Sequence, residues 1–272
     1  MMEKVDIIKW LKGKGFPFEM ECAQNFKDAG FTVQPSLHYK DLETNKIREI
    51  DFCAFRQISI GDFMFNVSFI VECKDSNTPW VGLTNKNSFE PIDFTSNIHS
   101  TKNCSKLKED FANKELELFT YNVGKEEYLI HNLQQIRTKN NSKDSAYEGI
   151  QQALSACDYL KAKANNSNLK FANIYIPVVV QSNKLYAVQA EDNINEDNLT
   201  EKEYMKFVRV NAFSENPLSI VHIVSGLHLK SYCEKIIEEF HYMGENLSSE
   251  IKRISKESPT NSSKGEYTIS SI

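Results

Sequence analysis

IDF at residues 50–52 and FIVECK at residues 69–74 carry charged side chains at the ends of two apolar, β-branched runs. Runs of this composition predict buried strands, which nearly exclude charged residues unless these are paired, bound to a metal or functional. Side chains alternate across a strand, so Glu72 and Lys74 are expected on one face. Asp51 lies on the preceding strand of a predicted meander, and its carboxylate is therefore expected near both of them.

Such a group has the donor chemistry of a divalent-metal site. The side chains of Asp51 and Glu72 and the backbone carbonyl of Cys73 are hard oxygen ligands, which suit Mg²⁺. Lys74 beside the metal is expected to orient or deprotonate an attacking water and to neutralise developing charge. The pattern therefore predicts in-line hydrolysis of a phosphodiester. The alternative is a structural salt bridge at the strand ends, for which Arg48 and Lys74 supply part of the basic partners.

The spacing Glu-x-Lys is weak evidence without its context. A second copy occurs at Glu250 and Lys252, on a polar stretch with helical periodicity and no aspartate strand before it. That pair is interpreted as solvated charges on a helix. Glu72 and Lys74 differ from it because they directly follow an apolar strand.

Hydrophobic periodicity predicts a helix, three strands in a meander, a second helix and further strands. The expected elements are a helix at residues 18–29, strands at residues 31–39, 47–55 and 63–73, a helix at residues 145–163, and strands at residues 171–180, 185–189, 207–210 and 219–224. A hairpin is expected around Ser182 and Asn183, between two of these strands. One long amphipathic helix is expected at residues 227–254.

This order of elements and motifs resembles the PD-(D/E)XK nuclease superfamily, which has the restriction-endonuclease-like fold. REID at residues 48–51 is similar to the aspartate motif of that superfamily, and VECK at residues 71–74 to its (D/E)XK motif. Ile50 stands where the superfamily usually has a proline. The predicted fold class is α/β, with a restriction-endonuclease-like core, a mixed central β-sheet flanked by helices (αβββαβ), an insertion after the third strand and a long C-terminal helix. The resemblance implies metal-dependent cleavage, here with Mg²⁺ or alternatively Mn²⁺.

The resemblance also points to residues on two predicted helices. The first core helix of such folds often carries an additional acidic ligand, and Glu19 shares the apolar side of that helix. Glu19 is therefore the expected outer metal ligand and a member of the catalytic group, with Glu21 as the alternative. The helix dipole alone also favours an acid in a first helical turn. Gln151 and Gln152 of the second helix are expected just behind the site, or else on a neutral helix surface.

The composition is that of an ordinary globular chain. Its 272 residues are 40% hydrophobic, and the net charge of -5 shows no global basic field for nucleic acid. We expect one domain at residues 1–257 with an insertion at residues 75–142, followed by a disordered tail at residues 258–272. Six scattered cysteines without a C-x-x-C pair favour reduced thiols and a cytoplasmic location.

The function expected from these residues is that of a metal-dependent nuclease, with DNA favoured over RNA, in defence against foreign DNA or in repair. Trp80 and Phe89 are candidates for stacking on bases, and packing explains them equally well. Basic residues that could follow a phosphate backbone, or form a solvated face, are Lys102, Lys106, Lys108, Lys114, Arg137, Lys139 and Lys143. The alternative function is a non-catalytic nucleic-acid- or protein-binding module on the same fold. A homodimer or a partner protein could use the helix at residues 227–254, and no membrane partner is expected.

Overall fold

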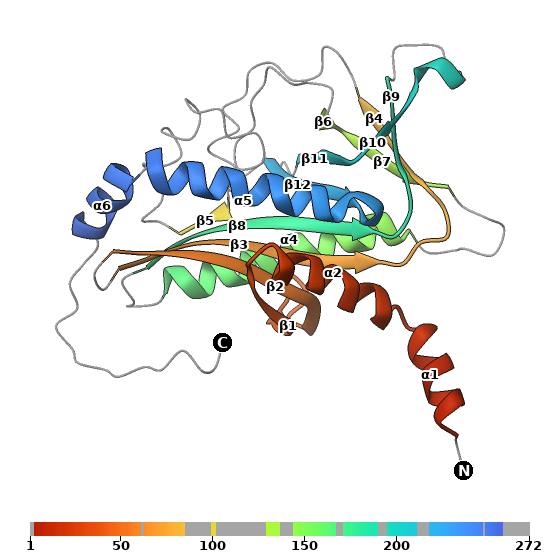
Figure 1. Cartoon of the computed structure of the whole chain (residues 1–272), viewed down its shortest axis with the longest axis horizontal. Coiled ribbons are helices and arrows are strands. Elements are labelled where there is room, and N and C mark those ends of the chain that lie inside the picture. Colours follow the sequence, from red (N-terminus) through yellow and green to blue (C-terminus); the bar gives the residue numbers. More distant parts are fainter. Residues whose placement is uncertain are drawn as a thin grey trace.

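A mixed β-sheet with helices on both faces organises the chain (Figure 1). The computed structural model describes residues 3–60, 63–84, 99–101, 129–136, 144–166, 171–189, 195–210, 218–246 and 248–257. In the first part these form α1 (Lys4–Lys12), α2 (Phe16–Asp28), β1 (Thr32–Lys40), β2 (Ile47–Ile60), β3 (Phe63–Lys74), β4 (Trp80–Thr84), β5 (His99–Ser100), β6 (Leu129–Ile130) and β7 (Asn132–Gln135). There follow α4 (Ser145–Asn165), β8 (Phe171–Gln181), β9 (Leu185–Gln189), β10 (Leu199–Lys202), β11 (Tyr204–Val210), β12 (Leu218–Ser225), α5 (Leu229–Asn246) and α6 (Ser248–Glu257).

The larger sheet has the strand order β1-β2-β3-β8-β12-β11-β6, and β5 pairs with β8 off this path. β1 to β3 form an antiparallel meander, whereas β3, β8 and β12 run parallel. Lys74 pairs with Gln181, which pairs in turn with Ser225, so the carboxyl ends of these three strands meet at one edge. Open α/β sheets bind ligands beyond the carboxyl ends of parallel strands. This edge is therefore the expected place for a site.

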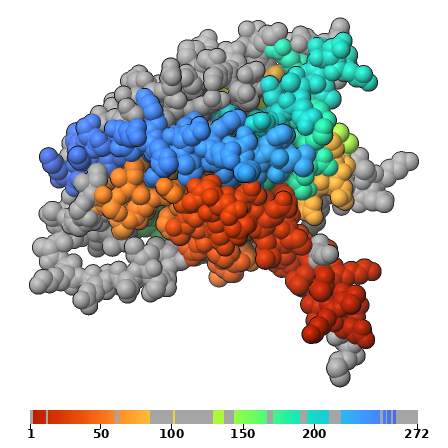
Figure 2. Space-filling model, in the orientation of Figure 1, coloured from red at the N-terminus to blue at the C-terminus, as the bar shows by residue number. Residues whose placement is uncertain are grey.

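Both faces of the larger sheet are buried under helices. Every odd-numbered residue of β3 from Phe63 to Cys73 packs in one core with residues of α2 and α5, and Figure 2 shows these two helices side by side. On the other face, Ile70 packs in a second core with Ile150 and Ala153 of α4. The two-residue period of a strand therefore directs Glu72 and Lys74 toward α4 and Cys73 away from it, as the sequence predicts.

Local sequence explains where α2, the helix that carries Glu19, begins and ends. Gly15 precedes it with a φ of 83°, a left-handed conformation that costs glycine little. Pro17 lies in the first turn, where no intrahelical amide bond is lost. Gly30, with a φ of 87°, follows the last turn and lets the chain reverse into β1.

An aromatic cluster anchors α2 on the sheet. The buried ring of Phe26 lies 5.4 Å from that of Phe31, 5.5 Å from that of Phe52 and 6.0 Å from that of Phe69, measured between centroids. Two of these contacts are edge-on, which is a favoured geometry for aromatic pairs. The cluster ties one helix to β2 and β3 and so determines where the start of α2 lies relative to Asp51.

The predicted α/β class with a mixed sheet flanked by helices is confirmed, but the predicted hairpin of β8 and β9 is wrong. β9 pairs with β4 and β10 in a second sheet, of strand order β10-β9-β4-β7. The side-chain amide of Gln181 donates hydrogen bonds of 2.6 Å to the carbonyls of both Asn183 and Lys184. This turn leads the chain away from β8 instead of back along it.

The long C-terminal helix expected at residues 227–254 is two helices, α5 and α6, which Figure 1 shows at an angle to one another. Residue 247, between them, lies outside the described residues. Asn246 and Ser248 flank the break. Short polar side chains compete with the helix for backbone hydrogen bonds and favour helix ends, which the hydrophobic period does not reveal.

Parts of the predicted insertion at residues 75–142 belong to the sheets. β4 and β7 form half of the smaller sheet, and β6 extends the larger one. The predicted tail at residues 258–272 lies outside the described residues.

α1 projects from the body of the molecule in Figures 1 and 2, with Val5 71% and Trp10 54% exposed. Among the described helices, none is both long and apolar enough to cross a membrane.

Candidate active site

Asp51 lies where the ladder between β2 and β3 ends. The last assigned pair is Phe52 with Val71, and the backbone N–H of Cys73 then donates to Oδ2 of Asp51 at 2.6 Å. The Asp51 carboxylate thus accepts the Cys73 N–H, which a backbone carbonyl of β2 would accept if the ladder continued. Across on β1, Ser36 adopts a φ of 53° at the position facing Asp51. The pair of strands β1 and β2 is therefore locally distorted at Asp51.

The hairpin of β1 and β2 also changes face at this point. Phe52 packs in the core under α2 and α5, whereas Ile50 packs in the core under α4, although two residues on one strand normally share a face. The register itself continues without an inserted residue, since Pro35 pairs with Phe52 and Leu37 with Ile50. The tip of the hairpin therefore bends over α4.

Glu72 and Lys74 form a buried ion pair that α4 covers. Nζ of Lys74 lies 2.6 Å from Oε1 of Glu72 and donates a second bond of 2.9 Å to Oε1 of Gln152. The second carboxylate oxygen of Glu72, Oε2, is buried and has no hydrogen-bond partner among the described residues. An unpaired buried carboxylate oxygen is costly, and it is the kind of atom that a proton or a cation would satisfy.

Glu19 lies in the first turn of α2, half buried. Burial and then the charges of Asp51 and Glu49 raise its pKa to about 7 from an ordinary value of 4.5, while Lys74 acts in the opposite direction. Glu19 is therefore within electrostatic reach of the strand-end group. Glu21, the sequence alternative, is exposed, and its backbone carbonyl accepts a bond from the side chain of Asn25.

The charge of Asp51 raises the pKa values of both Glu19 and Glu72. Burial and then Asp51 raise the pKa of Glu72 to about 8, even though Lys74 opposes them. Burial also raises the pKa of Asp51, against the hydrogen bond from Cys73 and the charge of Lys74. Among the described residues, Lys74 is the cationic side chain that lowers all three of these values. Fully ionised, three carboxylates and one ammonium leave two uncompensated negative charges, which equal the charge of one divalent cation.

The donor set fits a hard divalent ion, although the side chains are not gathered around one. Asp51, Glu72 and Glu19 offer carboxylate oxygens, the ligands that Mg²⁺ and Mn²⁺ prefer. Within the described part of the chain, no three His, Cys, Asp or Glu side chains are close enough together to hold a metal ion. Mg²⁺ usually takes only one or two protein carboxylates and completes its shell with water and substrate oxygens. The carbonyl of Cys73 stays a predicted ligand.

Several other predicted residues lie elsewhere. Gln151 is turned to Arg209 of β11, whose Nη1 donates to its Oε1 at 3.0 Å, so only Gln152 of this pair contacts Lys74. Trp80 is fully buried in β4 and is not available for stacking on a base. Arg48 pairs at 2.9 Å with Asp41 rather than with Asp51, which weakens the purely structural explanation of the acids. Phe89 and the predicted basic residues at 102–114 and 137–143 lie outside the described residues.

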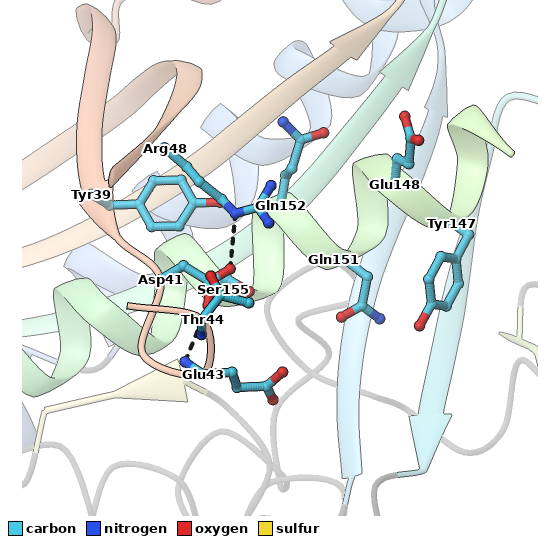
Figure 3. A pocket seen from close by; sticks show the side chains of 10 residues that line it. All are labelled: Tyr39, Asp41, Glu43, Thr44, Arg48, Tyr147, Glu148, Gln151, Gln152 and Ser155. Atoms are coloured by element: carbon cyan, nitrogen blue, oxygen red, sulfur yellow. Dashed lines mark hydrogen bonds and ion pairs between the residues drawn. The ribbon is translucent and has the colours of Figure 1, made fainter. Parts of the chain in front are cut away.

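A pocket between the β1–β2 hairpin and α4 was not expected from the sequence. Its volume is about 510 Å³, and it is bounded by Tyr39 and Arg48 on the hairpin side and by Tyr147, Gln151 and Gln152 on the helix side (Figure 3). Residues of the hairpin and of α4 are about a hundred positions apart. Tyr39 and Arg48 flank a polar turn whose composition predicts only a solvent-exposed loop.

The fold and the site define an α/β protein with a carboxylate–lysine group at the carboxyl edge of a mixed sheet. Comparison of the chain with protein-family models, with curated proteins and with solved structures found no match.

Proposed function

We propose that this protein is a divalent-metal-dependent nuclease with a PD-(D/E)XK core, and that DNA is its preferred substrate. The observation that carries the proposal is that Lys74 pairs with Glu72 on β3, while Asp51 of β2, bonded to the Cys73 N–H, and Glu19 of α2 interact electrostatically with this pair. When all three acids are ionised, their charge exceeds that of Lys74 by two, and a bound divalent cation would compensate this excess.

The order of elements supports the same family. A helix, a three-stranded meander, a helix and a strand parallel to β3 follow one another as α2, β1, β2, β3, α4 and β8. The aspartate lies on the second strand and the Glu-x-Lys at the end of the third, at the carboxyl edge of the sheet. This corresponds to the αβββαβ pattern expected of a restriction-endonuclease-like core.

In this proposal Asp51 and Glu72 would hold the metal, together with the carbonyl of Cys73 and the outer carboxylate of Glu19. A bound Mg²⁺ or Mn²⁺ would supply Lewis acidity, lowering the pKa of a coordinated water and polarising a phosphoryl oxygen. Lys74 directs two of its three N–H donors to Glu72 and Gln152. The third can donate to a phosphate oxygen or orient the attacking water. Gln152 positions the ammonium group, and Cys73 orients Asp51 through its backbone N–H.

Cleavage of defined substrates tests the proposal. Supercoiled plasmid, linear duplex, single-stranded DNA and RNA are incubated with Mg²⁺, with Mn²⁺ or with chelator. Cleavage is expected to need the metal, and Lys74→Ala and Asp51→Ala are each expected to lower its rate by roughly 10²–10³-fold, as loss of one charge-stabilising group typically does.

The second Glu-x-Lys supplies the matched control. Lys252 is exposed on α6, so Lys252→Ala removes the same side chain in the same sequence spacing and is expected to leave the rate unchanged. If no substrate is cut, or if both site variants cut as fast as the unmodified protein, the catalytic proposal is wrong. Metal-independent binding of nucleic acid without cleavage would instead favour the binding module.

A further inference from the structure

The pocket between the hairpin and α4 shares a wall with the candidate active site. Gln152 lines the pocket and also accepts the 2.9 Å bond from Lys74, which itself contacts Glu72. Figure 3 shows Gln152 between the hairpin residues and the rest of α4. A group bound in the pocket would therefore lie one side chain away from the acids. Its volume of about 510 Å³ is within the range of small-ligand pockets, roughly 300–1,000 Å³.

Two buried polar atoms at the pocket have no hydrogen-bond partner among the described residues. Tyr39 is 1% exposed, its hydroxyl has no hydrogen-bond partner among the described residues, and in Figure 3 this hydroxyl lies beside Arg48. The amide nitrogen of Gln151 is likewise buried and unpartnered in the described part of the chain. Buried polar groups normally find partners. The tyrosine hydroxyl and the glutamine amide nitrogen can both donate a hydrogen bond, and the hydroxyl can also accept one. A ligand with donors and acceptors along its edge would therefore supply the missing hydrogen bonds.

The charges of the pocket argue against a phosphate as its occupant. Arg48 is already paired with Asp41, at 2.9 Å. Two further acids, Glu43 and Glu148, line the pocket, so its net charge is negative. Phosphate groups would be repelled, whereas a neutral ring with amino and carbonyl groups would not be.

An exposed aromatic ring stands at the pocket. Tyr147 is 60% exposed in the first turn of α4, where its backbone N–H donates to the side chain of Asp144, the N-cap, at 3.1 Å. Stacking of a base on such a ring contributes about 1–3 kcal/mol and tolerates any base. Bases of an intact duplex are stacked on one another and do not offer their faces.

We propose that this pocket receives the base of an unpaired nucleotide next to the scissile phosphate, so that the preferred substrate is single-stranded or locally unpaired nucleic acid. Tyr147 stacks on the base and Gln151 contacts its edge, while Tyr39, at the opposite end of the pocket in Figure 3, contacts the adjoining part of the nucleic-acid strand, and the neighbouring phosphate lies at the acids. The position of that phosphate rests on the proposed nuclease function, whereas recognition of the base does not.

Binding is measured with a single strand of about 12 nucleotides, a length typical of single-strand sites, that carries one 2-aminopurine. The fluorescence of this base falls when it stacks on an aromatic ring. DNA and RNA versions, and a duplex with the same base, are titrated with Ca²⁺ in place of Mg²⁺. Quenching is expected with the single strands and not with the duplex, and the DNA and RNA arms show which sugar is preferred.

Tyr147→Ala is expected to weaken single-strand binding about tenfold and to abolish the quenching. Tyr242→Ala is the matched control, because Tyr242 is 40% exposed on α5, over the opposite face of the sheet. Tyr39→Phe keeps the buried ring and is expected to weaken binding at least about threefold, as loss of one net hydrogen bond does.

Affinity and quenching that are unchanged in both Tyr147→Ala and Tyr39→Phe would overturn the base-pocket assignment, as would equal quenching by the duplex. Plasmid cleavage with Mg²⁺ is measured on the same preparations. If both variants still cleave plasmid and bind the single strand as the unmodified protein does, the pocket assignment is wrong and the nuclease proposal stands. Quenching that depends on Tyr147 in a protein that cuts no substrate would support the pocket and refute the nuclease.

Discussion

At the scale of single residues, Asp51 both joins two strands and carries a carboxylate near two other acids. Its carboxylate ends the β2–β3 ladder by accepting the Cys73 N–H, and it also repels Glu72 and Glu19. The sequence was enough to predict that this acidic side chain lies on a strand. The hydrogen bond to Cys73 could not be predicted, because it depends on the distortion of the strand pair opposite Ser36.

Glu72 makes stability depend on pH. Its folded pKa is raised from 4.5 to about 8, so protonation favours the folded state. The contribution of Glu72 is fully present below about pH 4.5 and is lost as the pH rises through about 8, and Glu19, with a pKa raised to about 7, acts in the same direction. In chelator, the thermal midpoint is therefore expected to fall over this range.

The test is Glu72→Gln, which is expected to flatten the pH dependence of the midpoint. The slope that remains is assigned to Glu19 and Asp51. Glu201→Gln, which alters an exposed ion pair with Lys184, is the control and should leave the slope unchanged. A midpoint of the unmodified protein that rises with pH across this window would contradict the assigned sign.

At the scale of elements, α4 is held close to β3 by a glycine. A Cβ at Gly149 would lie 3.0 Å from Cε of Lys74 and 3.1 Å from Cγ1 of Val179. The helix packs tightly there because no side chain intervenes. This places Gln152, one turn further along α4, within hydrogen-bond distance of Lys74.

Gly149→Ala is expected to lower cleavage by at least about tenfold because the new methyl group displaces Lys74. Its stability should change by less than about 2 kcal/mol, since overpacking opposes the gain of about 1 kcal/mol in helix propensity. Gly244→Ala on α5 is the matched control: among the described residues its Cβ would meet only Ile58, at 3.7 Å. It should stabilise the fold by roughly 0.5–1 kcal/mol without affecting activity. Equal activities of the two variants would refute the role of Gly149.

The docking of α2 depends on Phe26, and Phe26→Ala should lower the free energy of unfolding by about 3–5 kcal/mol, as for other buried aromatic residues. Phe16, on the same helix, is 42% exposed, and Phe16→Ala should cost less than about 1 kcal/mol. Urea denaturation measures both. A small loss for Phe26→Ala would show that the aromatic cluster does not anchor the helix.

At the scale of the whole molecule, metal binding should couple to folding. The acids come from α2, β2 and β3, and unfolding separates them. At about pH 8, Mg²⁺ at 100 times its dissociation constant should add about 2.7 kcal/mol to the free energy of unfolding. Sodium chloride at equal ionic strength should not reproduce this. Asp51→Asn should remove the effect, and an equal increase in that variant would rule out Asp51 as a ligand.

Much of the core could be predicted because the relevant signals are local. The strand period of residues 63–73 and the helical period of residues 145–163 are visible in the sequence and were sufficient to place Glu72, Lys74 and Gln152 on their elements. The pairing of β9 with β4, instead of β8, could not be predicted, because the competing partners differ only in long-range packing. The break between α5 and α6 was missed because both helices continue one hydrophobic period.

Residue type and spacing were thus enough to predict the α/β class and to select the strand acids and the lysine as candidate site residues, since charge in an apolar strand is unusual wherever the strand lies. The excess of negative charge and the pocket depended on contacts between distant segments. Glu19 approaches Asp51 only because Phe26 docks α2, and the pocket exists only because the β1–β2 hairpin bends over α4. Such contacts depend on the packing of whole elements, which no local pattern of residues encodes.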